Sequence, residues 1–337
     1  MMKMNHKWIA LLLVIGIICA VCVGCDNPQS GTENPGGTPG NTPGKDTSAT
    51  TQGETPDAPV TKYGNYTTEG TARTLEELFK DEVKHTEDTF ATGTSYSDEK
   101  IANVYKIADY IANYEKYVEE YNAQEEFDKL YAETGFTMDF GFGAEMIKHY
   151  IGMSGETYDY TARMKEMLEF PKVGAAQTTC INAAMKAAEN LVKDGQSGVT
   201  INQLTPVSFS SLKSTDGPIY FALGSYHAMA DLTNVQRTGD TFSATVTFRI
   251  VDYYDWSKDI TEPEFSTYLD KLDDDYRTLI SEIVDMPSLE TFCQADMAQL
   301  HYAGYAQNFL AHGTIVYTVT WTAGQTFDQA TVQTFPT

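Results

Sequence analysis

The sequence predicts an α+β fold in which a helical N-terminal half packs on a C-terminal antiparallel β-sheet with interspersed helices. Apolar residues recur at helical spacing in the first half of the folded region, whereas runs in the second half alternate between apolar and polar residues. We expect one α+β domain over 62–337, helical over 62–200 and β-rich over 201–337, because no second linker and no repeat interrupts it.

Four helices are expected in the first half. Thr74-Leu-Glu-Glu77 has the spacing of a capping box before an apolar pair. The segment 97–121 begins with a capping serine and, from Ile101, carries apolar residues at i, i+3, i+7 and i+10, which predicts a helix. Two further helices are expected over 145–151 and 175–192, because glycines follow them and stop the helical pattern.

The second half is expected to contain strands. The segments 219–235 and 241–251 are rich in β-branched and aromatic residues, and a Thr-Gly-Asp turn at 238–240 separates them, which predicts a β-hairpin. Within 241–251 apolar and polar residues alternate, as in a strand with one buried face. A helix over 264–284, a short helix over 296–303 and a closing strand over 314–322 complete the expected elements.

The N-terminal segment has the composition of an export signal. Lys3 and Lys7 precede an apolar run over 8–23, which is followed by a small residue, Gly24. This order of positive, apolar and small residues is typical of a secretory signal peptide, and we place it at 1–24. The apolar run is shorter than the roughly 20 residues of a bilayer span.

The segment Cys22-Val23-Gly24-Cys25 resembles a bacterial lipobox, in which the invariant cysteine is acylated and becomes the new N-terminus. The resemblance implies a lipoprotein that is anchored to the cell membrane by a lipid on Cys25 and faces outside the cytoplasm. An uncleaved anchor, or ordinary cleavage that leaves Cys25 free, remains open. Residues 25–61 are rich in Pro, Gly and Thr, with almost no large apolar residue, which predicts a disordered tether.

The composition excludes some partners. The chain contains 23 Lys and Arg against 47 Asp and Glu, and its net charge is −24. Removal of the signal peptide takes away two lysines and no acidic residue, so the mature charge is −26. Because phosphate backbones are bound by clustered Lys and Arg, nucleic acid is not expected as a partner, and neither is charge-driven docking on anionic lipid.

Two cysteines, Cys180 and Cys293, remain in the folded domain once the signal peptide and Cys25 are set aside. An exported domain permits one Cys180–Cys293 disulfide. The alternative is a buried free thiol, because Cys180 lies in an alanine-rich helical segment.

A cluster of polar and aromatic residues at the end of the clearest strand forms the candidate catalytic set. Asp252 and Asp255 could converge on one edge of the sheet, where two close carboxylates divide acid and base roles. Hairpin pairing would bring His227 near them, and Tyr254 and His301 complete the set. The alternative is that the aspartates turn the chain, the aromatic residues pack in the core and each histidine is structural.

The sequence carries no local signature of a metal or cofactor site. No HExxH, CxxC, GxSxG or phosphate-loop motif occurs, and Asp273-Asp274-Asp275 lacks the spacing of a calcium loop. We therefore expect no metal and no cofactor.

Three segments in order, 215–226, 252–256 and 300–309, are similar to uncharacterised C-terminal domains of bacterial polymorphic toxins, which implies a toxin-like domain without an assigned activity. The order of Ala222-Leu-Gly224 and Asp252-Tyr-Tyr-Asp255 also resembles colicin M-type phosphodiesterases, which cleave the lipid-linked peptidoglycan precursor. That family has a His-Arg pair five residues after the aspartates, where this chain has Thr261-Glu262.

Two functions therefore compete. The first is a non-catalytic binding or interaction module of the cell envelope, which recognises a protein or cell-wall ligand through tyrosine and tryptophan side chains. The alternative is a toxin-like envelope effector or hydrolase with a site around Asp252, Asp255 and His227. A resident or immunity-like role is a third possibility, since a permanent lipid anchor would retain the domain at the membrane.

Overall fold

The computed structural model describes residues 61–70, 77, 94–209 and 217–334. Residues 58–337 form one compact unit, distinct from 1–57. The predicted signal peptide, Cys25, the predicted tether except its last residue, and Thr74 of the predicted capping box lie outside the described residues. Within the described ranges, no helix combines the length and the apolar composition that a membrane span requires.

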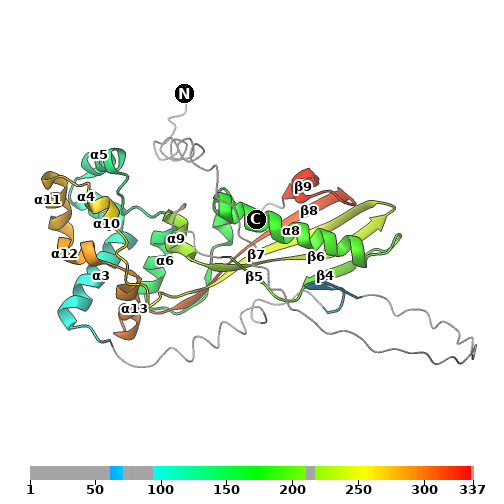
Figure 1. Cartoon of the computed structure of the whole chain (residues 1–337), viewed down its shortest axis with the longest axis horizontal. Coiled ribbons are helices and arrows are strands. Elements are labelled where there is room, and N and C mark those ends of the chain that lie inside the picture. The colour runs from blue at the N-terminus through cyan, green and yellow to red at the C-terminus, as the bar shows by residue number, and fades with distance from the viewer. Residues whose placement is uncertain (1–60, 71–76, 78–93, 210–216, 335–337) are drawn as a thin grey trace, which may run out of the picture. The chain divides into compact units, whose positions relative to one another are not determined.

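The fold is α+β, as the sequence predicts, and its centre is a mainly antiparallel sheet (Figure 1). Three long strands form the middle of this sheet: β6 (Tyr226–Thr238), β7 (Thr241–Tyr254) and β8 (Phe309–Thr322). The hydrogen-bonded order is β1-β2-β4-β6-β7-β8-β3, while β5 also pairs with β6 and β9 with β8. The short strands are β1 (Lys62–Tyr63), β2 (Tyr66–Thr67), β3 (Tyr158–Asp159), β4 (Val199–Gln203), β5 (Val207–Phe209) and β9 (Thr331–Thr334).

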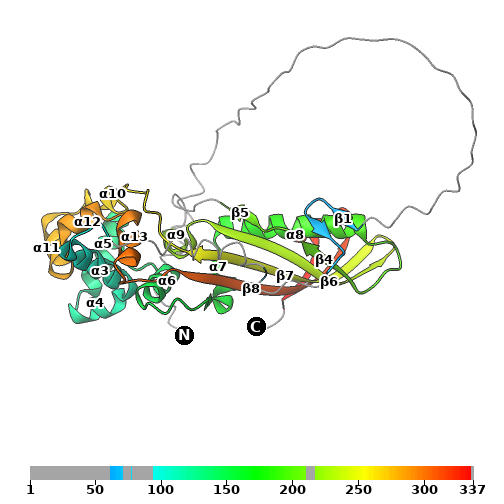
Figure 2. The same ribbon diagram turned by 90° about the horizontal axis from the view of Figure 1, so that it is seen from below.

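Strand β7 has the alternation that predicted it. Its even-numbered residues from Phe242 to Ile250 are buried, whereas the odd-numbered residues between them are only partly buried. The long helix α8 (Pro171–Leu191) packs on β6 and covers this buried face (Figure 2). Ala184, Ala187 and Ala188 are fully buried in α8, and such small side chains let the helix approach the sheet closely.

The other large group of helices gathers where β7 ends and β8 begins (Figures 1 and 2). Helix α3 contacts α6, α12 and α13, so chain segments on both sides of the β6–β7 hairpin form one cluster, which we call the helical end. The bounds of the remaining helices are α3 (Asp98–Ala112), α4 (Tyr114–Glu120), α5 (Gln124–Thr134), α6 (Phe142–Ile151), α7 (Met164–Met167), α9 (Gly217–Leu223), α10 (Ser266–Leu269), α11 (Asp274–Ile283), α12 (Met286–Thr291) and α13 (Gln294–Tyr302).

The predicted helices at 145–151, 175–192 and 296–303 and the strand at 314–322 are confirmed, and each begins a few residues earlier than expected, as α6, α8, α13 and β8. The prediction is wrong for 219–223, which lie in α9 rather than in a strand. A turn at Gly224, with φ of 60°, separates α9 from β6. A short apolar run suits a buried helix as well as a buried strand, so the pattern could not distinguish them.

Two predicted helices are each divided in the structure. The segment 97–121 is interrupted at Asn113, whose side-chain amide donates to Asp109 Oδ1 at 2.8 Å and competes with the helical pattern. The segment 264–284 is divided before Asp273, whose carboxylate accepts the amide of Tyr276 at 3.1 Å and caps α11. In both cases a short polar side chain interrupts or starts a helix at a position that apolar spacing does not reveal.

The predicted Cys180–Cys293 disulfide is wrong, because both thiols are free and buried. Cys180 lies in α8, where its backbone oxygen accepts the hydroxyl of Tyr66 at 3.2 Å. Cys293 instead caps α13, which packs on α3 at the helical end. Burial raises the pKa of the Cys180 thiol to about 12, so Cys180 is a core residue, as the alternative interpretation of the sequence held.

A buried polar network joins β4 to β6 at the point where the two strands separate. The backbone amide of Gln203 donates to Asp231 Oδ1 at 2.8 Å. The backbone amide of Ala230 donates to the side-chain oxygen Oε1 of Gln203 at 2.9 Å. The hydroxyl of Tyr66 on β2 also donates to Gln203 Oε1, at 3.1 Å. Because side chains satisfy these main-chain groups, β4 can leave β6 and pair with β2 without a buried unpaired amide.

Asp231 also pairs with a cation. Its Oδ2 accepts a hydrogen bond from Arg249 Nη1 of the neighbouring strand β7 at 2.8 Å, and its side chain is only 1% exposed. A carboxylate this deeply buried is stable only when a counter-charge and hydrogen bonds replace its water. Asp231 has both, and it links β4, β6 and β7.

Replacing Asp231 with alanine should leave the Arg249 guanidinium and the Gln203 amide without their partner. We expect Asp231→Ala to lower the free energy of unfolding by about 3–5 kcal/mol, measured by urea denaturation. Asp240→Asn, in the exposed turn between β6 and β7, is the control and should change it by less than about 0.5 kcal/mol. An Asp231→Ala protein as stable as the wild type would contradict this role.

Candidate functional site

Two of the predicted catalytic residues, His227 and Asp252, do not come together. His227 pairs with Val251, and Asp252 pairs with Ala311, in the ladders that flank β7. Directly paired residues point to the same face of a sheet, and successive residues point to opposite faces. The side chains of His227 and Asp252 therefore lie on opposite faces of the sheet, although the two residues are on neighbouring strands.

Two members of the predicted set lie on the covered face. Asp252 is buried, and it is close enough to Tyr160 to add to the effect of burial in raising the pKa of that tyrosine. The hydroxyl of Tyr254 donates to the backbone oxygen of Phe221 at 2.9 Å, and its ring stacks on Phe309 with 4.9 Å between centroids. Tyr254 is thus a packing residue, as the alternative interpretation of the sequence held.

The last two members lie at the helical end. Asp255 is exposed, and its charge adds to the effect of burial in raising the pKa of Tyr150. The Tyr150 hydroxyl donates to the backbone oxygen of Met297, at 3.0 Å. His301, on α13, has Nδ1 at 3.3 Å from the backbone oxygen of Ala306, and burial lowers its pKa. Asp255 and His301 therefore lie close to hydrogen bonds that hold α6 and α13 in place.

The sheet face opposite α8 carries a polar cluster that the sequence did not reveal. His227 and His312 lie on either side of Val251, and Arg249 and Asp231 are near them on the same face. His312 is buried, with Nδ1 at 3.8 Å from Asp159 Oδ1. In the sequence, Arg249 is a charged residue within an alternating strand, and this could have indicated a polar site. No spacing in the sequence related Arg249 to His227 or His312.

A serine and a histidine meet on the loop after α6, and their geometry excludes a nucleophile–base pair in this state. His149 Nε2 lies 3.1 Å from Ser154 Oγ and 2.8 Å from the backbone oxygen of Glu156. A carbonyl oxygen only accepts hydrogen bonds, so Nε2 carries a proton and donates it. A protonated Nε2 cannot remove the proton of the serine hydroxyl, as nucleophilic catalysis would require.

Metal chemistry has no assembled donor set in the described part of the chain. Across 61–70, 77, 94–209 and 217–334, no three His, Cys, Asp or Glu side chains gather with the geometry of a metal site.

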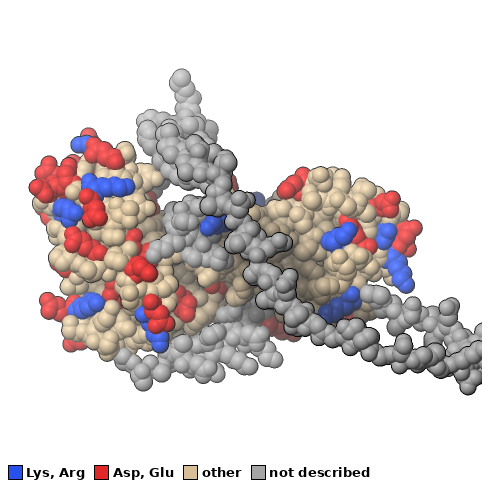
Figure 3. All heavy atoms as spheres, viewed as in Figure 1, with Lys and Arg blue, Asp and Glu red and all other residues tan. Residues whose placement is uncertain are grey.

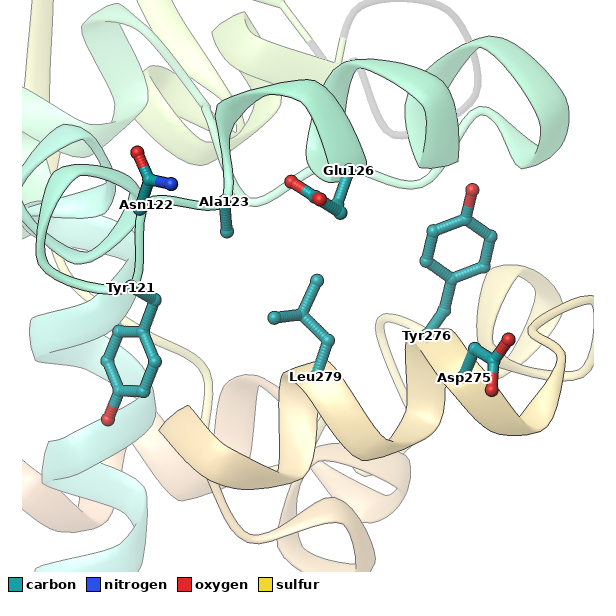
Figure 4. Close-up of a pocket in the computed structure, with 7 residues that line it drawn as sticks. All are labelled: Tyr121, Asn122, Ala123, Glu126, Asp275, Tyr276 and Leu279. Atoms are coloured by element: carbon teal, nitrogen blue, oxygen red, sulfur yellow. The ribbon is translucent and has the colours of Figure 1, made fainter.

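A hollow of about 230 Å³ lies at the helical end, between the α4–α5 turn, α5 and α11 (Figure 4). Its lining combines tyrosine rings and apolar side chains with an amide and two carboxylates, and it contains none of the predicted catalytic residues. The lining residues are Tyr121, Asn122, Ala123, Glu126, Asp275, Tyr276 and Leu279. The high tyrosine content indicated a recognition surface, but no sequence pattern relates Tyr121 to Tyr276.

Comparison with known proteins assigns no relative. No family model, no curated protein and no solved structure matches the chain.

The buried histidines predict how stability depends on pH. Burial lowers the pKa of His301 and of His312 from 6.5; at His312 Asp159 opposes this effect and Arg249 adds to it. Both imidazoles stay neutral in the folded protein at pH values where the unfolded chain is already protonated, so the unfolded state binds more protons. The contribution of these histidines to the free energy of unfolding should therefore be complete above pH 6.5, and the free energy of unfolding should fall as the pH drops below that value.

Urea denaturation between about pH 7.5 and pH 5.5 measures this dependence, because the carboxylates titrate mainly below that range. The double variant His301→Gln/His312→Gln should show a flatter dependence than the wild type. Stability that increases as the pH falls through this range would refute the assignment.

Proposed function

We propose that the protein is a lipid-anchored binding module that faces outside the cytoplasm and is held to the cell membrane by an acyl group on Cys25. The signal-peptide pattern over 1–24, the lipobox resemblance and the Pro/Gly/Thr-rich composition over 25–61 support the anchor. A mature charge of −26 repels an anionic envelope surface, and that repulsion favours a domain held away from the surface to which it is tethered.

The observation that carries the binding role is the separation of Asp252 from His227 by the alternation of the strands. Acid–base catalysis requires both groups within about 3 Å of the atoms that exchange protons on one substrate. Side chains on opposite faces of a sheet cannot meet that condition. The Tyr254 hydroxyl, which is bound to a backbone oxygen, also favours binding over hydrolysis.

Exposed tyrosines supply a recognition surface for this role. Tyr121, Tyr131, Tyr268 and Tyr305 are between 36% and 51% exposed, and all four belong to elements of the helical end or the loop that follows α13. Tyrosine combines a large apolar ring with a hydrogen-bonding hydroxyl and is enriched at interfaces for that reason. The helical end is therefore the part of the molecule that we propose meets a protein or cell-wall ligand.

The anchor is tested by removing the thiol that would carry the lipid. In the full chain, Cys25→Ala should move the protein from the membrane fraction to the soluble fraction and abolish incorporation of a labelled fatty acid. Cys19→Ala, in the apolar run before the lipobox, is the matched control and should remain membrane-bound and labelled. Unchanged membrane association of Cys25→Ala would show that the lipid is not the anchor.

The hydrolase alternative is tested by overproducing the wild-type chain and Asp255→Asn in the envelope of a test bacterium. We expect identical growth and identical amounts of the lipid-linked peptidoglycan precursor, because Asp252 and His227 lie on opposite faces of the sheet. Loss of the precursor with the wild type, and its recovery with Asp255→Asn, would establish the enzyme instead. Retention of the purified chain on an envelope fraction, with no change in that fraction, would support the binding role.

A further inference from the structure

The hollow at the helical end has the composition of a small binding site. Leu279 of α11 and Ala123 of the α4–α5 turn are its apolar side chains and point into it from opposite sides, and Tyr121 and Tyr276 lie at its two ends (Figure 4). The Tyr121 hydroxyl donates a hydrogen bond to the backbone oxygen of Glu282 at 3.1 Å. Only the ring of Tyr121 is therefore left to contact a ligand.

Tyr276 contributes a polar atom that is buried without a partner. The residue is 8% exposed, and among the described residues none lies within hydrogen-bond distance of its hydroxyl, although Lys129 is near enough for its pKa to respond to Tyr276. Figure 4 shows the side chain projecting from α11 toward α5 along the rim of the hollow. Buried hydroxyl groups are satisfied in nearly all proteins, so an orphaned one at a hollow indicates a place where a ligand supplies the missing partner.

The charge around the hollow is negative. Glu126 of α5 points into it, Asp275 of α11 lies at its edge beyond Tyr276, and both are exposed (Figure 4). Residues 98–134 contain ten Asp and Glu against four Lys, and residues 266–291 contain seven against two Lys and Arg. Figure 3 shows acidic side chains spread over the helices at this end, with basic side chains between them. Because acidic side chains outnumber basic ones here, the local field favours cations over anions at the hollow.

Lys129 lies near Tyr276, and its pKa shows the effect of the surrounding charge. Lys129 Nζ lies 5.9 Å from the centroid of the Tyr276 ring, at the outer edge of cation–π distance. The pKa of Lys129 is raised, first by Tyr276 and next by Glu133. The neighbouring Tyr276 and Glu133 side chains therefore favour the ammonium form of Lys129, which is 67% exposed.

We propose that this hollow binds an organic ammonium group, such as the amine of a lysine side chain or of a small cationic metabolite. The tyrosine rings receive the cation and its carbon stem, the carboxylates of Glu126 and Asp275 balance its charge, and the Tyr276 hydroxyl accepts one of its N–H groups. An anion would meet two carboxylates, and a neutral sugar would gain nothing from them. This assignment rests on the proposed binding function and gives it a ligand class.

The test is a calorimetric titration of the full chain, at about 10 mM salt so that screening is weak, with Nα-acetyl-lysine methylamide. The matched probe, Nα-acetyl-norleucine methylamide, has the same shape without the ammonium group, and N-acetylglucosamine represents a sugar. For a ligand of this size in an open hollow, we expect a Kd of roughly millimolar for the lysine probe and much weaker binding for the other two.

Three variants locate the site. Asp275→Asn should weaken binding of the lysine probe about two- to fivefold, whereas Asp274→Asn, the same change one residue away from the lining, should weaken it less than about twofold. Tyr276→Phe should weaken it about fivefold through the lost acceptor. The thermal unfolding temperature of this variant should be unchanged, because the hydroxyl makes no hydrogen bond with the part of the chain that the structure describes.

Equal affinity for the lysine and norleucine probes, stronger binding of the sugar, or equal effects of Asp274→Asn and Asp275→Asn would each overturn the ammonium assignment. If the lysine probe fails and the chain is still retained on an envelope fraction, the ligand class is wrong and the binding function stands. If both fail, the binding function itself is refuted.

Discussion

The sheet depends above all on the carboxylate of Asp231, because this one group joins three strands. Asp231 lies in β6, its Oδ1 accepts a main-chain amide of β4 and its Oδ2 accepts the Arg249 guanidinium of β7. The contact stands where β4 leaves its ladder to meet β2. A hairpin of two-residue strands is not stable alone, so β1 and β2 hold their place through this network and through Tyr66.

The long strands also limit what kind of site the molecule has. Because α8 covers one face of the sheet, each polar side chain on β6, β7 and β8 lies either under a helix or on the opposite face. Asp252 and Tyr254 belong to the covered face and serve packing, whereas His227 and Arg249 belong to the other. The same alternation that builds the core therefore separates the groups that a hydrolase would need together, and this favours recognition over catalysis.

The helical end is the surface that we propose for recognition. It is assembled from two stretches, 98–151 and 266–302, which the hairpin of β6 and β7 separates along the chain. Their junction between α5 and α11 forms the hollow, and both stretches bring an excess of acidic residues to it. The net charge of the chain thus has a local consequence, because it makes this tyrosine-lined hollow a place where a cation is favoured.

The sequence by itself determined the α+β class, the strand at β7, helices α6, α8 and α13, and an export pattern at the N-terminus, because periodicity and composition are local properties. It mistook α9 for a strand and left open a Cys180–Cys293 disulfide, which does not form. Only the tertiary structure decided which faces His227 and Asp252 occupy, how Gln203 meets Asp231, and that Tyr121 and Tyr276 border one hollow. These are contacts between distant segments, and they follow from strand register and helix packing, which no local pattern encodes.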